Sequence, residues 1–320
     1  MVTTESKFKA LIDQVDEFII EYANSRQELI NVAVTDLVKA GGKRLRPILM
    51  ILASEFGDDQ SEKKIKIASG LELLHMATLV HDDIIDEAST RRGELTTQNK
   101  FGKDVAVFVG DFLLTKAYNL FLEHLSRKAA LKFNQTVKLI CEGEVDQYES
   151  KFDPDLTING YLRRIRRKTA LLFAFSTYVG AYESGIRNTT LSNLYNLGLE
   201  MGMAFQIRDD ILDFVGEKRK VGKAVGQDLL AGIYTLPIVY LLESKESNKQ
   251  VKEILTKESI TEDDAILISE LVKNTGALAK SQQLEERFLD RAKYHLAQLP
   301  GNEAKQHLNY ILGYQVSREK

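Results

Sequence analysis

The sequence lacks several features that would point to other classes of protein. It contains a single cysteine, Cys141, and only four prolines in 320 residues. One cysteine excludes an internal disulfide framework and fits a reducing compartment, so we expect a cytoplasmic protein. Cys141 itself is expected to pack on a helix rather than to act as a nucleophile. Because there is also no Gly/Ser-rich linker, one domain over residues 1–320 is favoured over two.

Strong charge of one sign and long apolar runs are also missing. The formal net charge is -3, with 43 Lys and Arg against 46 Asp and Glu. No basic field therefore indicates a nucleic-acid partner or an anionic membrane. Residues 1–20 show no signal-peptide pattern, and the longest apolar stretch, 169–182, is interrupted by Ser176, Thr177 and Gly180. That stretch is too short to span a bilayer, so no transmembrane segment is expected.

What the sequence does contain is a helical period of apolar residues along nearly its whole length. Gly41 and Gly42 are predicted to end a helix that begins near Gln27, and Pro47 to lie in the first turn of the next helix. Further helices are predicted at about 61–85, 104–125, 128–150, 157–182, 189–215, 233–243, 262–273, 276–298 and 303–317. Strand-type alternation is absent, and the charged stretch 245–264 is expected to be a peripheral excursion. The predicted fold class is all-α, in one domain.

Two aspartate clusters of the same form stand out against this background. They read Asp-Asp-Ile-Ile-Asp at residues 82–86 and Asp-Asp-Ile-Leu-Asp at residues 209–213, and each follows an apolar helical run. The first and last Asp of each cluster are four residues apart and therefore share a helix face, where like charges repel. Carboxylates on helices, without a dedicated cage, suit Mg²⁺, which takes its remaining ligands from water and substrate phosphates. The pattern predicts metal binding.

Cationic residues near these clusters indicate anionic substrates. Lys43, Arg44 and Arg46 surround a predicted helix start, where free N–H groups also favour anions. The other cations are the pair Arg91 and Arg92, Lys168 before the apolar stretch, and Lys223 after the second cluster. One anion does not need all of these. The set predicts a cavity for two phosphorylated substrates, one bridged by metal and one held by cations alone.

These residues belong to an ordered set of motifs that resembles the trans-isoprenyl diphosphate synthases, or polyprenyl synthetases. The resemblance runs from about residue 39 to residue 242, with a looser match over 315–320. Its motifs are Gly-Gly-Lys-Arg at 41–44 with Arg46-Pro47, Glu-Leu-Leu-His at 72–75, His81 with the first cluster, Arg-Arg-Gly at 91–93, Gly143-Glu144, Lys168-Thr169, Phe205-Gln206 with the second cluster, Gly222-Lys223, Gly226 with Asp228-Leu229, and Thr-Leu-Pro at 235–237.

The resemblance implies a helical bundle around a deep central cavity, usually in a homodimer. The implied reaction is the head-to-tail 1′-4 condensation of isopentenyl diphosphate onto an allylic diphosphate. Catalysis is then mainly electrostatic stabilisation of the departing diphosphate. Mg²⁺ is the implied cofactor, with three ions when substrate is bound. The released diphosphate is the implied proton acceptor, so no side chain is named as a general base.

The resemblance also implies a role for each site residue. Direct Mg²⁺ ligands would be Asp82, Asp86 and Asp209, with Asp83, Asp210 and Asp213 acting through water or supporting the metal shell. The allylic diphosphate would be held by Arg91, Lys168 and Lys223, with Thr169 and Gln206 at the reacting end. Isopentenyl diphosphate would be held by Lys43, Arg46, His75 and Arg92. Of these, Asp82, Asp86, Arg91, Lys168, Asp209 and Lys223 would carry the catalytic step.

Product length is partly encoded beside the first cluster. The growing chain should descend along the helix past Ala77 and Thr78, where short-chain relatives place an aromatic ring. Small residues here leave room and favour products of about C20–C35, and the general pattern resembles medium-chain hexaprenyl or heptaprenyl catalytic components and geranylgeranyl diphosphate synthases. One position departs from the family, since Ile233 stands where a lysine is common two residues before Thr-Leu-Pro.

Three other classes of function stay open from the sequence. A class I terpene cyclase also ionises allylic diphosphates, but its second metal motif normally mixes Asn/Asp, Ser/Thr and Glu. A non-catalytic or weakly active subunit of a heteromeric synthase should have lost an Asp or a binding cation, and only Ile233 favours that. A structural helical protein with incidental Asp clusters should gain no stability from Mg²⁺ and a diphosphate.

Overall fold

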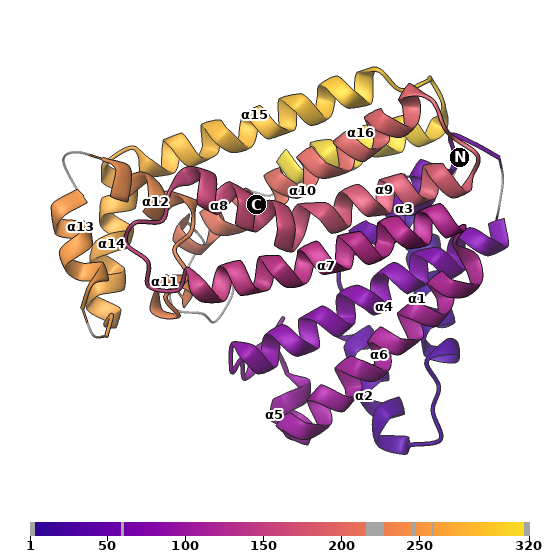
Figure 1. Ribbon diagram of the computed structural model, residues 1–320, viewed down its shortest axis with the longest axis horizontal. Coiled ribbons are helices and arrows are strands. Elements are labelled where there is room, and N and C mark those ends of the chain that lie inside the picture. The colour runs from indigo at the N-terminus through magenta and orange to yellow at the C-terminus, as the bar shows by residue number, and fades with distance from the viewer. Residues whose placement is uncertain (1–3, 59–60, 216–226, 245–247, 258, 317–320) are drawn as a thin grey trace. The chain divides into compact units, whose positions relative to one another are not determined.

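The protein is almost wholly helical (Figure 1). The computed structural model describes residues 4–58, 61–215, 227–244, 248–257 and 259–316. The helices are α1 Thr4–Tyr22, α2 Glu28–Lys39, α3 Leu45–Ser54, α4 Ser61–Ile85, α5 Thr97–Phe101, α6 Lys103–His124, α7 Arg127–Glu149, α8 Ile158–Ile165, the π-helix η1 Arg166–Ala170, α9 Leu171–Glu183, α10 Thr189–Val215, α11 Gln227–Leu230, α12 Leu236–Glu243, α13 Asn248–Leu255, α14 Glu262–Asn274, α15 Ala277–Ala297 and α16 Glu303–Val316. The all-α prediction is confirmed.

The helical period located most helices to within a few residues, and threonine caps explain several of the starts. Thr96, Thr157 and Thr261 each accept a hydrogen bond from the backbone N–H three residues later. At α14 the side chain of Asp264 also accepts from the N–H of Thr261, which completes a capping box. Each such cap stabilises its helix by about 1 kcal/mol.

The structure departs from the predicted pattern of helices in several places. Helix α1 was not predicted, although its buried residues Val15 and Ile19 are spaced by one helical turn. Helix α13 lies inside the stretch expected to be a peripheral excursion. The predicted helix 157–182 contains the π-helix η1. Strands are not wholly absent either, because β1 (Thr90–Arg91) pairs antiparallel with β2 (Glu94–Leu95).

The chain forms two compact units, each assembled from segments that are distant in sequence. Unit 1 comprises Met1–Asn134, Phe175–Tyr195 and Leu299–Tyr310. Unit 2 comprises Gln135–Ala174, Asn196–Gln298 and Ile311–Lys320. Each unit is described by itself below.

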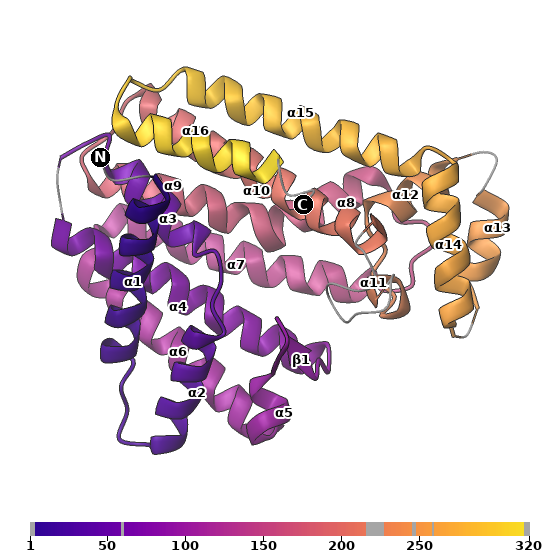
Figure 2. The same ribbon diagram turned by 180° about the vertical axis from the view of Figure 1, so that it is seen from behind.

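Helix α4 is central to unit 1 and contacts α1, α3, α5 and α6 (Figure 2). Two glycines allow α6 to approach it closely. A Cβ on Gly70 of α4 would lie 2.8 Å from the Phe121 ring, and one on Gly110 of α6 would lie 2.3 Å from Nε2 of His81. Since the residue numbers rise on one helix as they fall on the other, α4 and α6 are antiparallel. Ala77 shares the α4 face of Gly70 and His81 and therefore faces α6.

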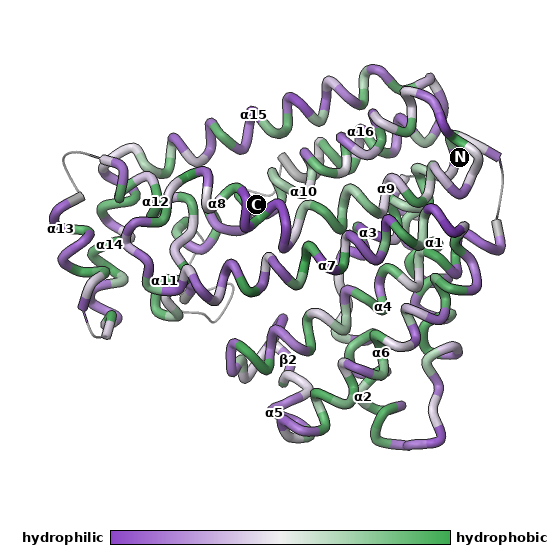
Figure 3. The backbone as a smooth tube through the Cα atoms, in the orientation of Figure 1, coloured by the Kyte–Doolittle hydropathy of each residue, from purple (hydrophilic) through white to green (hydrophobic). Residues whose placement is uncertain are grey.

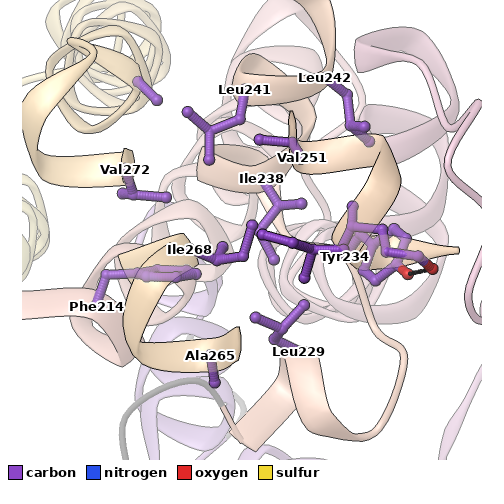
Figure 4. Close-up of a cluster of buried hydrophobic side chains, with 13 residues drawn as sticks. Phe214, Leu229, Tyr234, Ile238, Leu241, Leu242, Val251, Ala265, Ile268 and Val272 are labelled. Atoms are coloured by element: carbon purple, nitrogen blue, oxygen red, sulfur yellow. Dashed lines mark hydrogen bonds between the residues drawn. The ribbon is translucent and has the colours of Figure 1, made fainter. Parts of the chain in front are cut away.

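Unit 2 contains a compact apolar cluster, built mainly by α12 against α13 and α14 (Figure 4). Phe214 at the end of α10 belongs to this cluster, as does Tyr234, whose hydroxyl donates to the carbonyl of Leu255 at 3.1 Å. Helix α15 also contacts α12. Hydrophobic and hydrophilic residues alternate along α15, as expected for a helix with one buried face (Figure 3).

One helix of the described part of the chain, α6, is long and apolar enough to cross a membrane by length and composition alone. The sequence analysis had singled out 169–182 as the longest apolar stretch and did not name α6.

Candidate active site

The first aspartate cluster lies at the C-terminal end of α4 in unit 1. Asp86 follows the last residue of α4, and its N–H still donates to the carbonyl of Asp82 at 2.8 Å, so the helical turn continues. Asp86 is exposed and Asp82 half-buried, whereas Asp83 is buried. The predicted shared face of Asp82 and Asp86 is therefore present, and Asp83 points elsewhere.

Asp83 anchors the segment that follows the cluster. Its Oδ1 accepts from Nε of Arg91 at 2.8 Å, and its carbonyl accepts from the Gln98 amide at 2.6 Å. Burial raises the pKa of the Asp83 carboxyl, while the Arg91 guanidinium acts in the opposite direction. In this arrangement Asp83 fixes Arg91 and the segment that follows the cluster.

The Arg-Arg-Gly motif forms the turn between β1 and β2. Arg91 pairs with Glu94 across the ladder, which leaves Arg92 and Gly93 as a two-residue loop. Both have positive φ, 56° at Arg92 and 85° at Gly93. Positive φ at both positions defines a type I′ hairpin turn, whose twist matches that of the strands. The turn carries Arg92 to the Gly-Gly loop, where its guanidinium donates to the carbonyl of Gly41.

The Gly-Gly loop is built around a buried arginine that the sequence analysis did not assign. Arg44, at φ 45°, donates through Nε to Oδ1 of Asp16 at 2.8 Å and through Nη1 to Oε1 of Glu72 at 3.1 Å. A Cβ on Gly42 would lie 2.6 Å from Nη1 of Arg92 and 2.9 Å from Nη1 of Arg44. Only glycine leaves room for both guanidinium groups, which accounts for this position of the motif.

His75 is half-buried on α4 among these arginines. Burial lowers the pKa of His75 well below its ordinary value, and the nearby charges of Arg46, Arg92, Arg91 and Arg44 lower it further. The imidazole is therefore neutral at physiological pH and can offer one N–H to an anion. The structure thus brings together three residues predicted to hold isopentenyl diphosphate, namely His75, Arg46 and Arg92.

A pocket of about 310 Å³ adjoins this cluster within unit 1. One helix face of α4 lines it, with Glu72, Met76, Leu79 and Asp83 spaced at three or four residues. Arg91 and Arg92 line it from the hairpin. The predicted product-length residues are placed separately, since Ala77 is buried and Thr78, half-buried, donates its hydroxyl to the carbonyl of His75 at 2.8 Å.

The second aspartate cluster lies near the end of α10 in unit 2. As in the first cluster, the second aspartate is the buried one: Asp210 is buried, whereas Asp209 is exposed and Asp213 is half-buried. Asp210 accepts from the hydroxyl of Tyr161 at 2.6 Å and from the amide of Gln206 at 2.9 Å. Burial raises the pKa of Asp210 to about 7 despite both donors. In each cluster the second aspartate is thus bound within the protein.

Helix α10 is fixed just before the cluster by a buried ion pair. Nε of Arg208 lies 2.7 Å from Oε1 of Glu285 on α15, and both side chains are almost fully buried. This pair ties the turn that presents Asp209 to a second helix of unit 2. Neither residue was singled out in the sequence, because their partnership spans distant segments.

Lys168 and Thr169 lie in the π-helix η1, a rare element that frequently marks functional sites. Nζ of Lys168 lies 2.7 Å from Oε2 of Glu144 on α7, and the Thr169 hydroxyl donates to Oε1 of Gln206 at 2.7 Å. A Cβ on Gly143 would lie 2.7 Å from Cβ of Arg167, so glycine there lets α7 approach η1. These two contacts explain the Gly143-Glu144 motif: Gly143 allows the close approach of the two helices, and Glu144 pairs with Lys168.

Each aspartate cluster, taken by itself, offers donors that fit a divalent cation completed by substrate. Among the described residues, no three carboxylate, imidazole or thiol groups lie close enough to hold a metal ion by themselves. The accessible carboxylates of Asp82 and Asp86 on one face, and of Asp209, offer the hard oxygen ligands that Mg²⁺ prefers. Substrate phosphates and water would have to supply the rest.

Two predicted features lie partly or wholly outside the described residues. Lys223, with Gly222 and Gly226, falls in 216–226, and the looser C-terminal match extends into 317–320. Ile233 is described, with a half-buried side chain and a backbone N–H that donates to the carbonyl of Asp228 at 2.7 Å. Its side chain confirms that no cation stands at this position.

Comparison with known proteins shows the family to which this chain belongs. The profile of the polyprenyl synthetase family matches residues 27–272. Component 2 of the heptaprenyl diphosphate synthase of Geobacillus stearothermophilus is 38% identical over 291 residues, which cover 91% of this chain and 90% of that protein. The crystal structure of heptaprenyl diphosphate synthase from Staphylococcus aureus has a TM-score of 0.93 and 32% identity, covering 98% of this chain and 99% of that one. A polyprenyl synthase from Caulobacter crescentus CB15, complexed with calcium and isoprenyl diphosphate, has a TM-score of 0.90 and 32% identity, covering 98% and 96% of the two chains.

The fold and the site define an all-α prenyltransferase that acts on diphosphates. The chain belongs to the polyprenyl synthetase family, and the resemblance seen in its motifs is confirmed. Its enzyme class, a trans-polyprenyl diphosphate synthase, follows from that membership.

Proposed function

We propose that this enzyme condenses isopentenyl diphosphate head to tail with an allylic diphosphate, in the presence of Mg²⁺, to give a product of about C20–C35. The observation that carries the proposal is the repeated design of the two aspartate clusters. Each leaves its first and last aspartates at least partly exposed near a helix end and buries its second among protein donors. Incidental acidic residues on a helix surface have no reason to repeat this arrangement.

The chemistry begins with departure of the allylic diphosphate. Bound Mg²⁺, in three ions under this proposal, would neutralise the charge that develops on the leaving group. Asp82, Asp86 and Asp209 would hold it, while Asp83, Asp210 and Asp213 support those ligands. Arg91, Lys168 and Lys223 would bind the diphosphate directly. Arg91 and Lys168 are held in advance by Asp83 and Glu144, so little reorganisation is needed when charge develops.

Isopentenyl diphosphate would bind to Lys43, Arg46, His75 and Arg92 without metal. The neutral His75 suits this role because it can donate to a phosphate oxygen while the arginines supply the charge. The double bond of isopentenyl diphosphate then attacks the allylic carbon, and the released diphosphate accepts the proton that is lost. Thr169 and Gln206 would line the reacting end.

The direct test is to incubate pure protein with isopentenyl diphosphate, Mg²⁺ and allylic primers of several lengths, and to size the products. Elongated trans-prenyl diphosphates are expected. Cyclised hydrocarbons would instead indicate a terpene cyclase. Turnover that appears only when a second subunit is added would indicate the catalytic component of a heteromeric synthase, the role that the name of the Geobacillus relative suggests.

A homodimer is the proposed assembly, and we propose a cytoplasmic location for it. Phe108 on α6 and Leu122 at its far end are 64% and 73% exposed, although α6 is apolar enough to cross a membrane by composition. An apolar helix surface that is this exposed in a monomer indicates an interface with another subunit. Sedimentation of the pure chain should show a dimer. A stable monomer would indicate that a different subunit covers α6.

The two diphosphate sites should respond differently to loss of a lysine. Lys43→Ala should raise the KM for isopentenyl diphosphate about tenfold with little change in kcat, because ground-state anchoring is lost. Lys168→Ala should lower kcat by about 10²-fold, because it removes a cation from the leaving group and breaks the ion pair with Glu144. Steady-state kinetics with each substrate varied in turn measure both effects. A Lys43→Ala enzyme impaired only toward the allylic substrate would contradict the assignment.

Product length should depend on Ala77. Ala77→Phe places a ring at a buried position of α4 that now holds only a methyl group. Early condensations need no space at this depth, whereas later ones would be slowed roughly tenfold to hundredfold per step. The products should shift toward about C15–C20, and Ala77→Val should give an intermediate distribution. Chromatography of the dephosphorylated products measures this, and an unchanged distribution from a folded, active Ala77→Phe enzyme would show that the chain runs elsewhere.

A further inference from the structure

Four side chains of unit 2 form a continuous chain of hydrogen bonds. The hydroxyl of Tyr161 on α8 donates to Oδ2 of Asp210 at 2.6 Å. The other carboxylate oxygen, Oδ1, accepts from Nε2 of Gln206 at 2.9 Å. Oε1 of Gln206 in turn accepts from the Thr169 hydroxyl at 2.7 Å. Three elements, α8, η1 and α10, are joined in this way.

The direction of each bond in this chain is fixed by chemistry. In the structure Asp210 accepts at both of its oxygens, so it faces the NH₂ group of Gln206 rather than its carbonyl. A flipped amide would set its oxygen against the carboxylate. The carbonyl of Gln206 therefore points to Thr169, and the only proton of the Thr169 hydroxyl is committed to it. The orientation of both groups thus depends on Asp210.

Tyr161, which donates to Asp210, is itself fixed by its surroundings. Its side chain is fully buried, and the guanidinium of Arg164 lies 5.6 Å from the centre of its ring. Arg164 is itself fixed, because it donates to the carbonyl of Tyr234 at 2.5 Å and to the Ser150 hydroxyl at 3.3 Å. Because the Tyr161 ring is fixed, its 2.6 Å hydrogen bond leaves the Asp210 carboxyl little freedom to rotate.

We propose that Tyr161 and Asp210 are positioning residues for the reacting end of the allylic substrate, and that Asp210 does not ligate metal. This inference rests on the proposed function. Tyr161 acts through Asp210 and Gln206. Together they hold the Gln206 amide and the Thr169 hydroxyl in one orientation before the reaction, so that the negative ends of these two dipoles lie near the allylic carbon on which positive charge develops. Lys168 is the neighbour of Thr169 in η1, so the chain of bonds ends beside the cation that holds the leaving group.

A second buried tyrosine of this protein, Tyr234, is a matched control for removal of the Tyr161 hydroxyl. Tyr234 is equally buried in unit 2, and its hydroxyl also makes one hydrogen bond, to the Leu255 carbonyl (Figure 4). Tyr161→Phe and Tyr234→Phe each lose one buried hydroxyl bond, and Tyr234→Phe keeps the backbone carbonyl that Arg164 needs. A merely structural role for Tyr161 predicts the same outcome for both variants.

We expect Tyr161→Phe to lower kcat about tenfold or more, with the KM of both substrates within about twofold of wild type. Tyr234→Phe should keep kcat within about twofold, with a similar change in melting temperature. Equal kcat values for the two variants would overturn the inference. A wild-type enzyme that elongates no primer in the same assay would contradict the proposed function instead, so the two failures are distinguishable.

A double-mutant cycle tests the route through Gln206. If Tyr161 acts only by orienting this amide, Tyr161→Phe in a Gln206→Ala background should cause no further loss of kcat. Full multiplication of the two single effects would overturn the proposed route.

Discussion

Asp82→Ala and Asp209→Ala should each lower kcat by about 10³-fold or more, while the helical fold is kept. Each change removes a proposed direct ligand of Mg²⁺, and the metal supplies several kcal/mol of stabilisation to the departing diphosphate. Neither residue is fully buried, so no cavity forms. Asp82→Ala also relieves repulsion with Asp86 on the same face. Rates from a discontinuous elongation assay, with circular dichroism for the fold, measure the outcome.

Two exposed aspartates serve as controls, Asp104 in the first turn of α6 and Asp290 on α15. Their replacement by Ala should leave kcat within about twofold, since surface substitutions usually change little. Melting temperatures add a second readout. Mg²⁺ with a non-hydrolysable allylic diphosphate should stabilise the wild-type protein more than either alone, because only the bound pair completes the ligand set. Asp82→Ala or Asp209→Ala proteins that retain both near-normal turnover and this stabilisation would rule out the metal assignment.

Arg44→Met should destabilise the protein by about 3–5 kcal/mol, a large part of a typical total of 5–15 kcal/mol. Arg44 is buried, and its removal leaves the buried carboxylate of Glu72 without the guanidinium that it contacts at 3.1 Å. Thermal or urea unfolding measures the loss. Lys66→Met, which breaks the exposed pair with Glu62, is the control and should change the stability little.

The pH dependence of this defect follows from Glu72. Burial raises the pKa of Glu72, and Arg44 opposes that rise, so removing Arg44 should raise the pKa further. A carboxyl whose pKa is higher in the folded than in the unfolded state costs nothing below its unfolded pKa, and stability is lost as the pH rises through the folded pKa. The Arg44→Met deficit should therefore shrink near pH 4.5 and grow toward neutrality. A double variant, Arg44→Met with Glu72→Met, should recover much of the loss, and a deficit that is independent of pH would contradict the role of Glu72.

For the aspartate clusters, the sequence predicts which residues share a helix face, and the structure shows which of them are buried. The spacing of Asp82 and Asp86 predicts a shared helix face, because the helical period depends only on local geometry. Spacing cannot say which aspartate is buried. Asp83 and Asp210 differ from their neighbours only because Arg91 and Tyr161 meet them, and those partners come from other elements.

From the sequence alone one can read the all-α class, most helix positions, the two aspartate clusters and the family, because these depend on local period and on motifs in a fixed order. The hairpin at Arg92 and Gly93 was missed, since two-residue strands carry no periodic signal. Only the tertiary structure decided that Arg44 is a buried structural cation and that Tyr161 supports Asp210. Both outcomes depend on burial, which makes an unpaired charge or donor costly and so forces pairing with whichever side chain the fold brings near. No local pattern encodes that partner.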